Sequence, residues 1–309
     1  MRNRDSFAKQ GFYDKTETMK SKAKIGVIGG SGIYEIEGMS VIDEVKIKTP
    51  FGDPSDSLVR AQFEDREFIF LPRHGKGHRI LPSDVNSKAN LWALKSLGVE
   101  NVISISAVGS LQEQYPPEDF VIPDQLIDRT RSRPNSFFGE GIVGHVSFAE
   151  PFCADLSKRI FDAIQSESKK GTHLGGTYVC MEGPLFSTKA ESHLYRSWGC
   201  DIIGMTALPE AKLAREAEMA YATIGMVTDY DCWREDEAAV SVETVMKHVF
   251  SNVARIKILL PSILKAIPDD FSSPHHQAAR FAIMTSPTLF PGPTREKLSL
   301  FYSKYWEKN

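Results

Sequence analysis

The chain has 309 residues, of which 41% are hydrophobic and 25% charged, and 37 Lys and Arg stand against 40 Asp and Glu for a net charge of −3. A chain of this length and composition forms a large globular core without disulfides or metal staples. The near-neutral charge argues against a general nucleic-acid or membrane-surface binder, which needs a basic excess or stripe.

The sequence also indicates where the protein works. No apolar stretch approaches the roughly 18 residues of a membrane span, and residues 1–23 lack the apolar centre of a secretory signal. Because the cysteines are far apart and never spaced C-x-x-C, we expect free thiols in a reducing compartment, with no disulfide and no zinc site. They are Cys153, Cys180, Cys200 and Cys232. These features predict a cytoplasmic protein without a metal.

Hydrophobic periodicity and turn residues predict the elements of the first half of the chain. Residues 1–23 are polar and of mixed charge, so we expect them to form a flexible arm. The predicted elements that follow are strands at 24–30, 41–47, 57–63 and 67–72, a helix from Asp84 to Gly98 and a buried strand at 101–111.

Strands and helices continue to alternate in the second half, after a turn-rich segment at 112–150. The predicted elements are a helix from Pro151 to about Gln165, strands at 175–184, 200–206 and 221–231, helices from Thr188 and Pro209, and a long helix that Ser241 caps. Beyond Pro268 the chain is rich in Pro, Ser and His and ends in an aromatic tail. This alternation predicts one α/β domain at 24–267, followed by an extension at 268–309.

Small or polar side chains follow several of the predicted strands. In the first such turn, Gly30-Ser31-Gly32, Glu35 stands where a dinucleotide-binding fingerprint needs its third glycine, so that fingerprint fails. The backbone N–H groups of this turn and the Ser31 hydroxyl suit an anion, and a tight structural turn is the alternative.

Arg73-His74 ends the strand at 67–72 and enters a glycine-rich loop. A guanidinium beside an imidazole suits phosphate or carboxylate oxygens, which arginine binds in a bidentate manner. A solvated basic loop is the alternative interpretation.

Two further strand ends combine small residues with hydroxyls. Ser106-Ala107 allows close backbone approach at the carboxyl end of a strand, where α/β sheets commonly bind ligands. Met205-Thr206 precedes the helix from Pro209, whose N-terminus favours negative charge. The alternatives are a plain connection for the first segment and a core methionine for the second.

Asp229 and Asp231 follow the strand at 221–231 and are two residues apart, so in extended chain their side chains project to the same side. Two neighbouring carboxylates push their pKa values apart, and one then remains protonated near neutrality. A Mg²⁺-binding D-x-D loop and a surface turn are the alternatives. If the strand ends converge, they bind an anion with cations and hydroxyls and place an acid opposite it.

A series of segments in order across 24–265 carries a resemblance to a known family. The segments are GVIGGSGIYEI, TPFGDPSD, LPRHGKGHRILPSDVN, SAVGSL, AEPFC, MEGPLFSTKAES, IGMTALPEAKLAREAEMAYA, VTDYDCW and AVSVETVMK. They resemble the 5′-methylthioadenosine phosphorylases, of the trimeric purine nucleoside phosphorylase type.

This resemblance implies a single-domain purine nucleoside phosphorylase-like fold, an α/β structure with a distorted mixed β-sheet flanked by helices. The implied reaction is phosphorolysis of 5′-methylthioadenosine to adenine and 5-methylthioribose 1-phosphate, a step of purine and methionine salvage. Inorganic phosphate is then a co-substrate, and no cofactor or metal is expected. The implied assembly is a homotrimer with active sites near subunit interfaces, whose partners are the nucleoside and phosphate rather than nucleic acid or membrane.

The resemblance also assigns site residues by motif position. It assigns phosphate binding to Ser31, Arg73, His74, Ser106, Ala107, Ser187 and Thr206. It assigns the ribose face to Met205 and Ala107, base packing to Phe186, the polar edge of the base to Asp229 and Asp231, and the methylthio pocket to Val242 and Val245, with His145 entering from a neighbouring subunit. Leu185 departs from the family, which often has Arg there, and this departure alters one anchoring contact.

The implied catalytic residue is Asp229. The departing adenine gains negative charge, which a neutral Asp229 relieves by donating a proton at N7. An ionised Asp231 helps to keep Asp229 neutral and accepts from the 6-amino group, which favours adenine over 6-oxopurines. The alternatives are a 6-oxopurine or methylthioinosine phosphorylase, a methylthioadenosine nucleosidase that uses water, and a module that binds the nucleoside without cleaving it.

Overall fold

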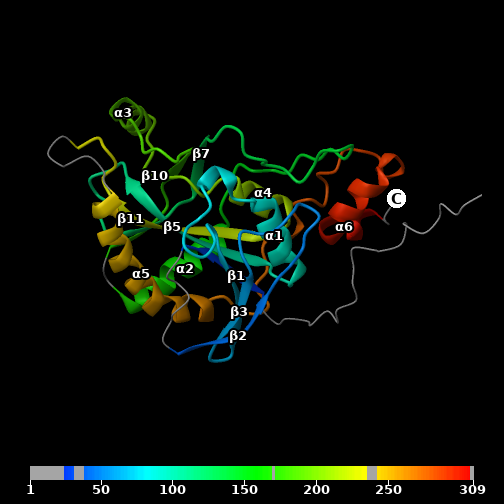
Figure 1. Cartoon of the computed structure of the whole chain (residues 1–309), viewed down its shortest axis with the longest axis horizontal. Helices are drawn as coiled ribbons and strands as arrows, with labels where there is room; N and C mark the ends of the chain where they lie inside the picture. Colours follow the sequence, from blue (N-terminus) through cyan, green and yellow to red (C-terminus); the bar gives the residue numbers. More distant parts are fainter. Residues whose placement is uncertain (1–23, 31–37, 169–170, 235–241, 307–309) are drawn as a thin grey trace, which may run out of the picture.

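An eleven-stranded mixed sheet forms the centre of the protein (Figure 1). The computed structural model describes residues 24–30, 38–168, 171–234 and 242–306, so the predicted arm at 1–23 lies outside the described residues. The strands are β1 (Ile25–Gly29), β2 (Met39–Val45), β3 (Leu58–Phe63), β4 (Arg66–Pro72), β5 (Asn101–Ser110), β6 (Phe120–Ile122), β7 (Gln125–Arg129), β8 (Thr172–Leu174), β9 (Thr177–Met181), β10 (Ile202–Gly204) and β11 (Ala220–Asp229).

The long strand β5 organises the sheet. Its first residues, 101–104, pair in parallel with β1, residues 101–109 pair in parallel with β11, and its last two residues pair antiparallel with β10. β4 is parallel to β1 on the far side. Because these parallel strands run in one direction, the segments after β1, β4, β5 and β11 emerge at the same edge of the sheet.

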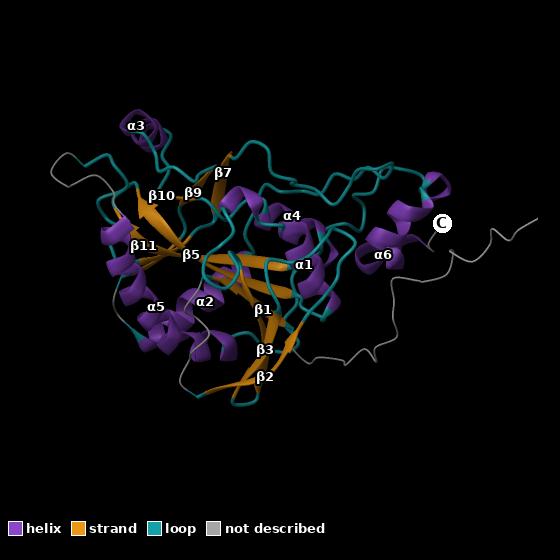
Figure 2. Cartoon of the chain, viewed as in Figure 1, coloured by secondary structure: helices purple, strands orange, loops and turns teal. Residues whose placement is uncertain are grey.

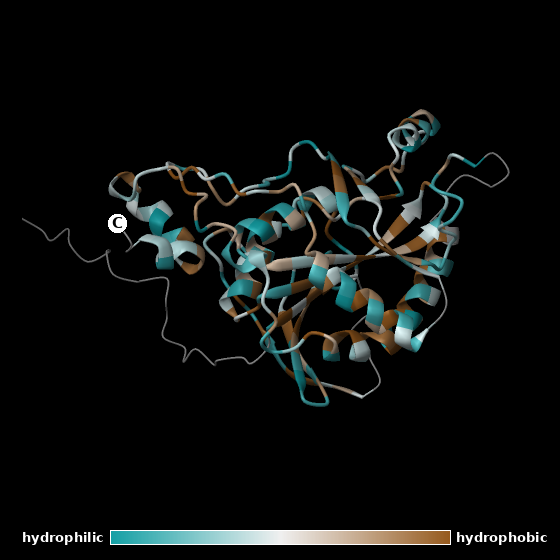
Figure 3. Cartoon of the chain, turned by 180° about the vertical axis from the view of Figure 1, so that it is seen from behind, coloured by the Kyte–Doolittle hydropathy of each residue, from teal (hydrophilic) through white to brown (hydrophobic). Residues whose placement is uncertain are grey.

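Helices cover both faces of the sheet (Figure 2). They are α1 (Ser87–Ser96), α2 (Ala154–Glu167), α3 (Lys189–Ser197), α4 (Glu210–Glu216), α5 (Val242–Lys265) and α6 (Gly292–Trp306), with short 3-10 turns at Pro82–Asp84, Pro274–Gln277 and Pro287–Leu289. One apolar core contains buried residues of α1, α4 and α6, and a second contains those of α2 and α5. Hydrophobic residues are concentrated in the strands between these helices (Figure 3). The predicted α/β fold with a mixed sheet flanked by helices is confirmed. None of the described helices is both long enough and apolar enough to cross a membrane.

Local capping explains where two of the helices begin. The helix predicted to start at Asp84 starts three residues later, because the side chain of Asn86 accepts a hydrogen bond from the Ala89 N–H at 3.1 Å. Asp84 ends a separate 3-10 turn, so that prediction was wrong. The capping box at Thr188 and Glu191 is confirmed, since each side chain accepts from the other residue's backbone N–H. Ser241 lies outside the described residues.

The extension at 268–309 contains a helix that the sequence analysis did not predict. Leu298, Phe301 and Tyr302 of α6 are buried, and the Tyr302 hydroxyl donates to the Glu216 carbonyl at 2.9 Å. The Tyr302 ring stacks on Phe138, which belongs to the long connection between β7 and α2. The described part of the extension therefore packs against the same core as α1 and α4.

Candidate active site

Arg73, directly after β4, is buried in a network of hydrogen bonds. Its Nε and Nη2 donate to the two carboxylate oxygens of Glu210 at 2.9 and 3.1 Å, and Nη2 also donates to the Ser104 hydroxyl at 2.7 Å. Burial, the largest single influence, lowers the pKa of Arg73, but the charge and hydrogen bonds of Glu210, together with Tyr221 and Tyr178, outweigh burial and leave that pKa raised. Arg73 is therefore a fixed positive charge beside β5.

The partner that fixes Arg73 is the first residue of α4. Glu210 also accepts from the buried Tyr221 hydroxyl at 2.8 Å, so both carboxylate oxygens are held. Nη1 of Arg73 donates to the Ile105 carbonyl at 3.1 Å, and among the hydrogen bonds of the described residues this leaves one of its hydrogens unused.

His74 is neutral in its present surroundings. Burial, followed by the charge of Arg73, lowers the pKa of His74 to about 4. Its Nδ1 lies 2.8 Å from the Ile80 carbonyl, an acceptor only, so Nδ1 carries the hydrogen and Nε2 carries the lone pair. In this tautomer Nε2 accepts a hydrogen bond and suits the hydroxyl of a hydrogen phosphate ion.

Two of the predicted phosphate-binding hydroxyls are buried without a partner. Neither Ser106 Oγ nor Thr206 Oγ1 makes a hydrogen bond to another described residue. In the antiparallel pairing of β10 with β5, Ile202 lies opposite Ser110 and Ile203 opposite Gly109. Continuing that register brings Thr206 to the level of Ser106. On this extended register Thr206, two residues after the end of β10, is level with Ser106 inside β5, and a ligand bound there would satisfy both hydroxyls.

Arg133, which the sequence analysis missed, joins the two loops that carry Met205 and Phe186. Its Nη1 donates to the carbonyls of Met205 and Leu208, each at 2.6 Å, and its Nη2 donates to the carbonyls of Met181 and Glu182. Its Nε donates to the Glu182 carboxylate at 2.9 Å, so all five of its N–H groups meet protein acceptors. Its sequence context, a turn-rich segment without periodicity, gave no signal of this role.

Asp229 and Asp231 lie together at the end of β11, as predicted, but not through the alternation of an extended strand. β11 ends at Asp229, and Asp231 has a φ of 53°, in the left-handed region. The turn lets the Asp231 N–H donate to Asp229 Oδ1 at 2.8 Å, while the Thr228 hydroxyl donates to Oδ2 at 2.7 Å. The expectation of an extended pair was therefore wrong, because a turn sets the geometry.

Burial raises the pKa of both aspartates. For Asp229 the charge of Asp231 adds to burial, and together they outweigh the hydrogen bonds from Thr228 and Asp231. For Asp231 burial outweighs the opposing influence of the polar groups around it, of which the nearby Ser192 hydroxyl has the largest effect. A carboxyl with a raised pKa keeps its proton to a higher pH than an ordinary aspartate does.

β5 passes directly beneath this pair. A Cβ added at Gly109 would lie 2.9 Å from Asp229 Oδ1, which is closer than real Cβ atoms come, and 3.5 Å from the Cβ of Asp231. Any side chain at Gly109 would therefore displace Asp229, and the glycine gives the carboxyl its place against β5.

The loop at 182–188 lies beside Asp231. The Ser187 hydroxyl is near enough to lower the pKa of Asp231, and the Ser187 carbonyl accepts from the Cys232 thiol at 3.3 Å. The structure therefore places Ser187 with the aspartate pair, and its contact with phosphate stays a prediction. Phe186 is 46% exposed and Leu185 is 82% exposed, so the apolar side chains of both residues reach the surface of this loop.

Helix α5 covers the other side of Asp229. Asn252 donates to the carbonyl of Val227 at 2.8 Å, and His248 lies 3.3 Å from a carboxylate oxygen of Glu118. The charge of His248 opposes the rise in the pKa of Asp229, so this histidine, which the sequence analysis missed, lies near the pair. Val245 is half-buried on the same helix. The side chain of Val242, like Ser31, lies outside the described residues.

His145 lies apart from these groups. It is exposed, and its backbone N–H donates to the Ala282 carbonyl at 2.9 Å, in the connection that approaches α6. The remaining predicted residue, Ala107, is exposed and lies within β5, beside Ser106 and before the end of the strand at Ser110.

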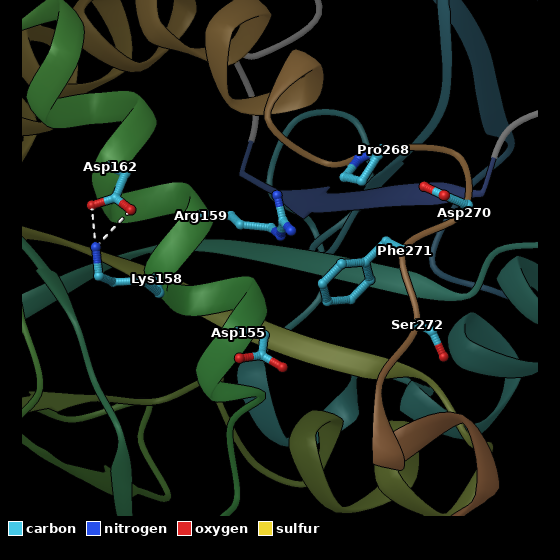
Figure 4. Close-up of a pocket in the computed structure, with 8 residues that line it drawn as sticks. All are labelled: Asp155, Lys158, Arg159, Asp162, Pro268, Asp270, Phe271 and Ser272. Atoms are coloured by element: carbon cyan, nitrogen blue, oxygen red, sulfur yellow. Dashed lines mark hydrogen bonds and ion pairs between the residues drawn. The ribbon is translucent and has the colours of Figure 1, made fainter.

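A surface pocket of about 470 Å³ lies elsewhere, between α2 and the segment at 268–272 (Figure 4). The two basic side chains that line it already bind protein groups, since Lys158 pairs with Asp162 at 2.6 Å and Arg159 donates to the Ala266 carbonyl at 3.2 Å. It contains none of the predicted site residues. In the described residues, no group of three or more His, Cys, Asp or Glu is arranged to hold a metal ion.

Comparison with known proteins decides the family. A family model described as the phosphorylase superfamily matches residues 24–265. This chain belongs to the phosphorylase superfamily. The S-methyl-5′-thioadenosine phosphorylase of Geobacter sulfurreducens is 50% identical over 282 residues, which are 91% of this chain and 98% of that protein. The protein of the same name from Synechocystis is 49% identical over 96% of this chain and 91% of its own length.

Solved structures agree with this placement in the phosphorylase superfamily. A methylthioadenosine phosphorylase from an antarctic soil metagenomic library superposes with a TM-score of 0.86 at 44% identity, covering 90% of this chain and 98% of that one. The methylthioadenosine phosphorylase of Schistosoma mansoni in complex with adenine has a TM-score of 0.79 at 37% identity, covering 84% of this chain and 96% of that one. The resemblance noted in the sequence is thereby confirmed.

Proposed function

We propose that this superfamily member is an S-methyl-5′-thioadenosine phosphorylase, a pentosyltransferase of purine and methionine salvage. It cleaves 5′-methylthioadenosine with inorganic phosphate and releases adenine and 5-methylthioribose 1-phosphate. Curated relatives about 50% identical over most of the chain bear this name, which supports the proposal. Phosphate enters as a co-substrate, and no cofactor is part of the reaction.

One observation carries the proposal: β5 connects a cationic, hydroxyl-lined site to an acid. Ser104 and Ile105 on this strand bind Arg73, and Gly109 lies against Asp229. Four residues of extended strand span about 13 Å at ~3.3 Å per residue. That separation suits a nucleoside whose base meets the acid and whose sugar lies over a phosphate.

The phosphate end supplies the nucleophile. As the C1′–N9 bond of the nucleoside breaks, positive charge develops on the sugar, and a phosphate dianion held beneath C1′ stabilises it before forming the new O–C1′ bond. Arg73 supplies positive charge there, and Ser106 and Thr206 supply hydroxyls that have no partner among the described residues. His74 Nε2 accepts the hydrogen of hydrogen phosphate.

The acid end activates the leaving group. The electron pair of the broken bond goes to adenine, and Asp229 transfers its proton to N7, so that neutral adenine leaves and Asp229 becomes ionised. The raised pKa of Asp229 supports this role. Asp231 accepts from the 6-amino group. A 6-oxopurine presents an acceptor there, which an ionised Asp231 repels.

We also propose a homotrimer in the cytoplasm. The loop that carries His145 exposes Val143, and the neighbouring segment exposes Phe281 and Met284 by 87% and 68%. Exposed apolar side chains around His145 support docking of this loop onto a neighbouring subunit. The four cysteines are free thiols, which supports a reducing compartment.

The deciding experiment measures adenine release from 5′-methylthioadenosine with and without phosphate. We expect release only with phosphate, together with one 5-methylthioribose 1-phosphate per adenine. Equal release in phosphate-free buffer makes the protein a nucleosidase, faster cleavage of methylthioinosine makes it a 6-oxopurine phosphorylase, and binding of the nucleoside without release makes it a binding protein.

A further inference from the structure

Tyr178 places a phenol hydroxyl in the core behind the phosphate end of the site. It lies on β9, its side chain is fully buried, and its hydroxyl makes no hydrogen bond to another described residue. Native proteins satisfy nearly all buried hydroxyls, because an unpaired one has given up its bonds to water. An unpaired phenol at this position therefore calls for a partner.

The backbone shows where that hydroxyl lies. Tyr178 is opposite Ile202 in the parallel pairing of β9 with β10. A Cβ added at Gly204 would lie 2.0 Å from the Tyr178 oxygen, so the phenol lies directly over this glycine and excludes any side chain from it. The ring thus follows β10 toward Thr206, two residues beyond Gly204.

The surroundings of the phenol agree with this path. Burial and then the charge of Cys180 raise the pKa of Tyr178, whereas the hydroxyl and backbone N–H of Thr206, which lie within reach of the phenol oxygen, and the charge of Arg73 oppose that rise. The phenol is therefore protonated at neutral pH and is a neighbour of Thr206 on the side of Arg73. Like the phenol, the buried hydroxyls of Thr206 and Ser106 have no hydrogen-bond partner among the described residues.

We propose that Tyr178 is a positioning residue for phosphate, whose hydroxyl donates a hydrogen bond to Thr206 Oγ1. This inference rests on the proposed function, in which Thr206 binds phosphate. A threonine hydroxyl has one hydrogen and two lone pairs. With a lone pair taken by the phenol, the Thr206 hydrogen points away from the core and donates to a phosphate oxygen. Tyr178 thus acts on phosphate through Thr206 without touching it.

The test removes only the phenol oxygen. Tyr178→Phe keeps the ring in the core and its contact with Gly204. We expect its KM for phosphate to rise three- to tenfold, with the KM for methylthioadenosine and the kcat at saturating phosphate within twofold of wild type. Tyr195→Phe is the matched control, because Tyr195 is a buried tyrosine of a separate cluster on α3. An unchanged phosphate KM in Tyr178→Phe, or an equal rise in both KM values, overturns the proposal.

A double-mutant cycle separates positioning from a general loss of packing. Thr206→Val removes the hydroxyl through which Tyr178 acts. If the proposal holds, adding Tyr178→Phe to Thr206→Val changes the phosphate KM by less than twofold. If the two changes multiply, Tyr178 does not act through Thr206. Thermal melting of each variant identifies any that is misfolded, and Gly204→Ala then serves as a second way to displace the phenol, with the same expected rise in phosphate KM.

These results are distinct from failure of the proposed function. If wild-type protein releases no adenine with phosphate, the reaction is wrong. If it does and Tyr178→Phe is unaltered, only the role of Tyr178 is wrong.

Discussion

At the residue scale, the candidate site depends on protons whose positions follow from burial. Asp229 has a raised pKa because it is buried and lies beside Asp231, whereas His74 has a lowered pKa because it is buried beside Arg73. The same loss of water thus raises the pKa of the acid and lowers that of the base. Each shift makes a separate prediction.

Asp229→Asn tests the acid. An amide cannot transfer a proton to N7 of adenine, but its NH₂ donates to a 6-oxo group. We expect kcat/KM for methylthioadenosine to fall by about 10²–10⁴, the usual contribution of a general acid, and the relative use of methylthioinosine to rise. Asp162→Asn is the control, since Asp162 is an exposed carboxylate paired with Lys158. The measurement is steady-state kinetics on both nucleosides. If the ratio of kcat/KM for methylthioinosine to kcat/KM for methylthioadenosine is the same as in wild type, the role of Asp229 is contradicted.

His74 makes stability depend on pH. Because its folded pKa is about 4, below the unfolded value of 6.5, the unfolded chain binds more protons between those values. The free energy of unfolding therefore rises with pH from about 4 to 6.5 and falls as the solution is acidified, by up to about 3 kcal/mol from this one group.

His74→Gln removes that contribution. Urea denaturation at pH 4.5 and at pH 7 gives the difference in the free energy of unfolding, and we expect the variant's difference to be smaller than that of wild type. His193→Gln, which removes an exposed imidazole, is the control and keeps the wild-type difference. A His74→Gln protein with the full wild-type difference shows that His74 is not buried in the neutral form.

At the element scale, Arg133 holds two loops that lie far apart in the sequence. Its guanidinium bonds to Glu182, in the loop before Phe186, and to the carbonyls of Met205 and Leu208 on either side of Thr206. Arg133→Lys leaves at most three donors for five acceptors. We expect kcat/KM to fall 10- to 100-fold and stability to fall by about 3 kcal/mol, as when a buried ion pair is broken.

Kinetics and chemical denaturation of Arg133→Lys check this prediction. Both the phosphate KM and the nucleoside KM rise, because both loops lose their common anchor. Arg131→Lys is the control: Arg131 is exposed, and only its backbone N–H bonds to Glu182. Wild-type values of both constants in Arg133→Lys contradict the anchoring role.

The sequence predicted elements with strong local signals and missed those that tertiary contacts create. The box at Thr188 and Glu191 and the buried strand at 101–111 follow from capping and continuous hydrophobicity, and both are confirmed. Strand β8 has three residues and exists by pairing with β6, so no period reveals it. Helix α6 follows a segment rich in Pro, Ser and His, and its burial against Phe138 comes from packing.

The same division holds in the candidate site. Asp229 and Asp231 stand out by composition, and the structure brings them together. The bonds of Arg73 with Glu210 and of Arg133 with the carbonyls at 205 and 208 join positions more than 70 residues apart, so their geometry is a property of the fold. Of the assigned residues, Ser31 and the side chain of Val242 lie outside the described part, and their roles stay predictions.

At the scale of the whole molecule, the candidate site lies at one edge of the sheet, and His145 lies in the connection between β7 and α2. α1, α4 and α6 cover one face and α2 and α5 the other, so the strand ends open at one edge. His145 is held by a bridge between Gly144 and Ile283 instead. If His145 completes an active site, that site belongs to another copy of the chain.

Complementation between subunits tests this arrangement. In a trimer whose sites take Asp229 from one subunit and His145 from the next, His145→Ala and Asp229→Asn damage different halves of each site. After the two variants are unfolded and refolded together in equal amounts, about a quarter of sites combine both intact residues, because each requirement is met half the time. We therefore expect the mixture to recover up to about a quarter of wild-type activity, whereas separately refolded variants mixed afterwards keep the mean of their own low rates. Activity of the co-refolded mixture equal to that mean contradicts a shared site and places His145 outside the reaction.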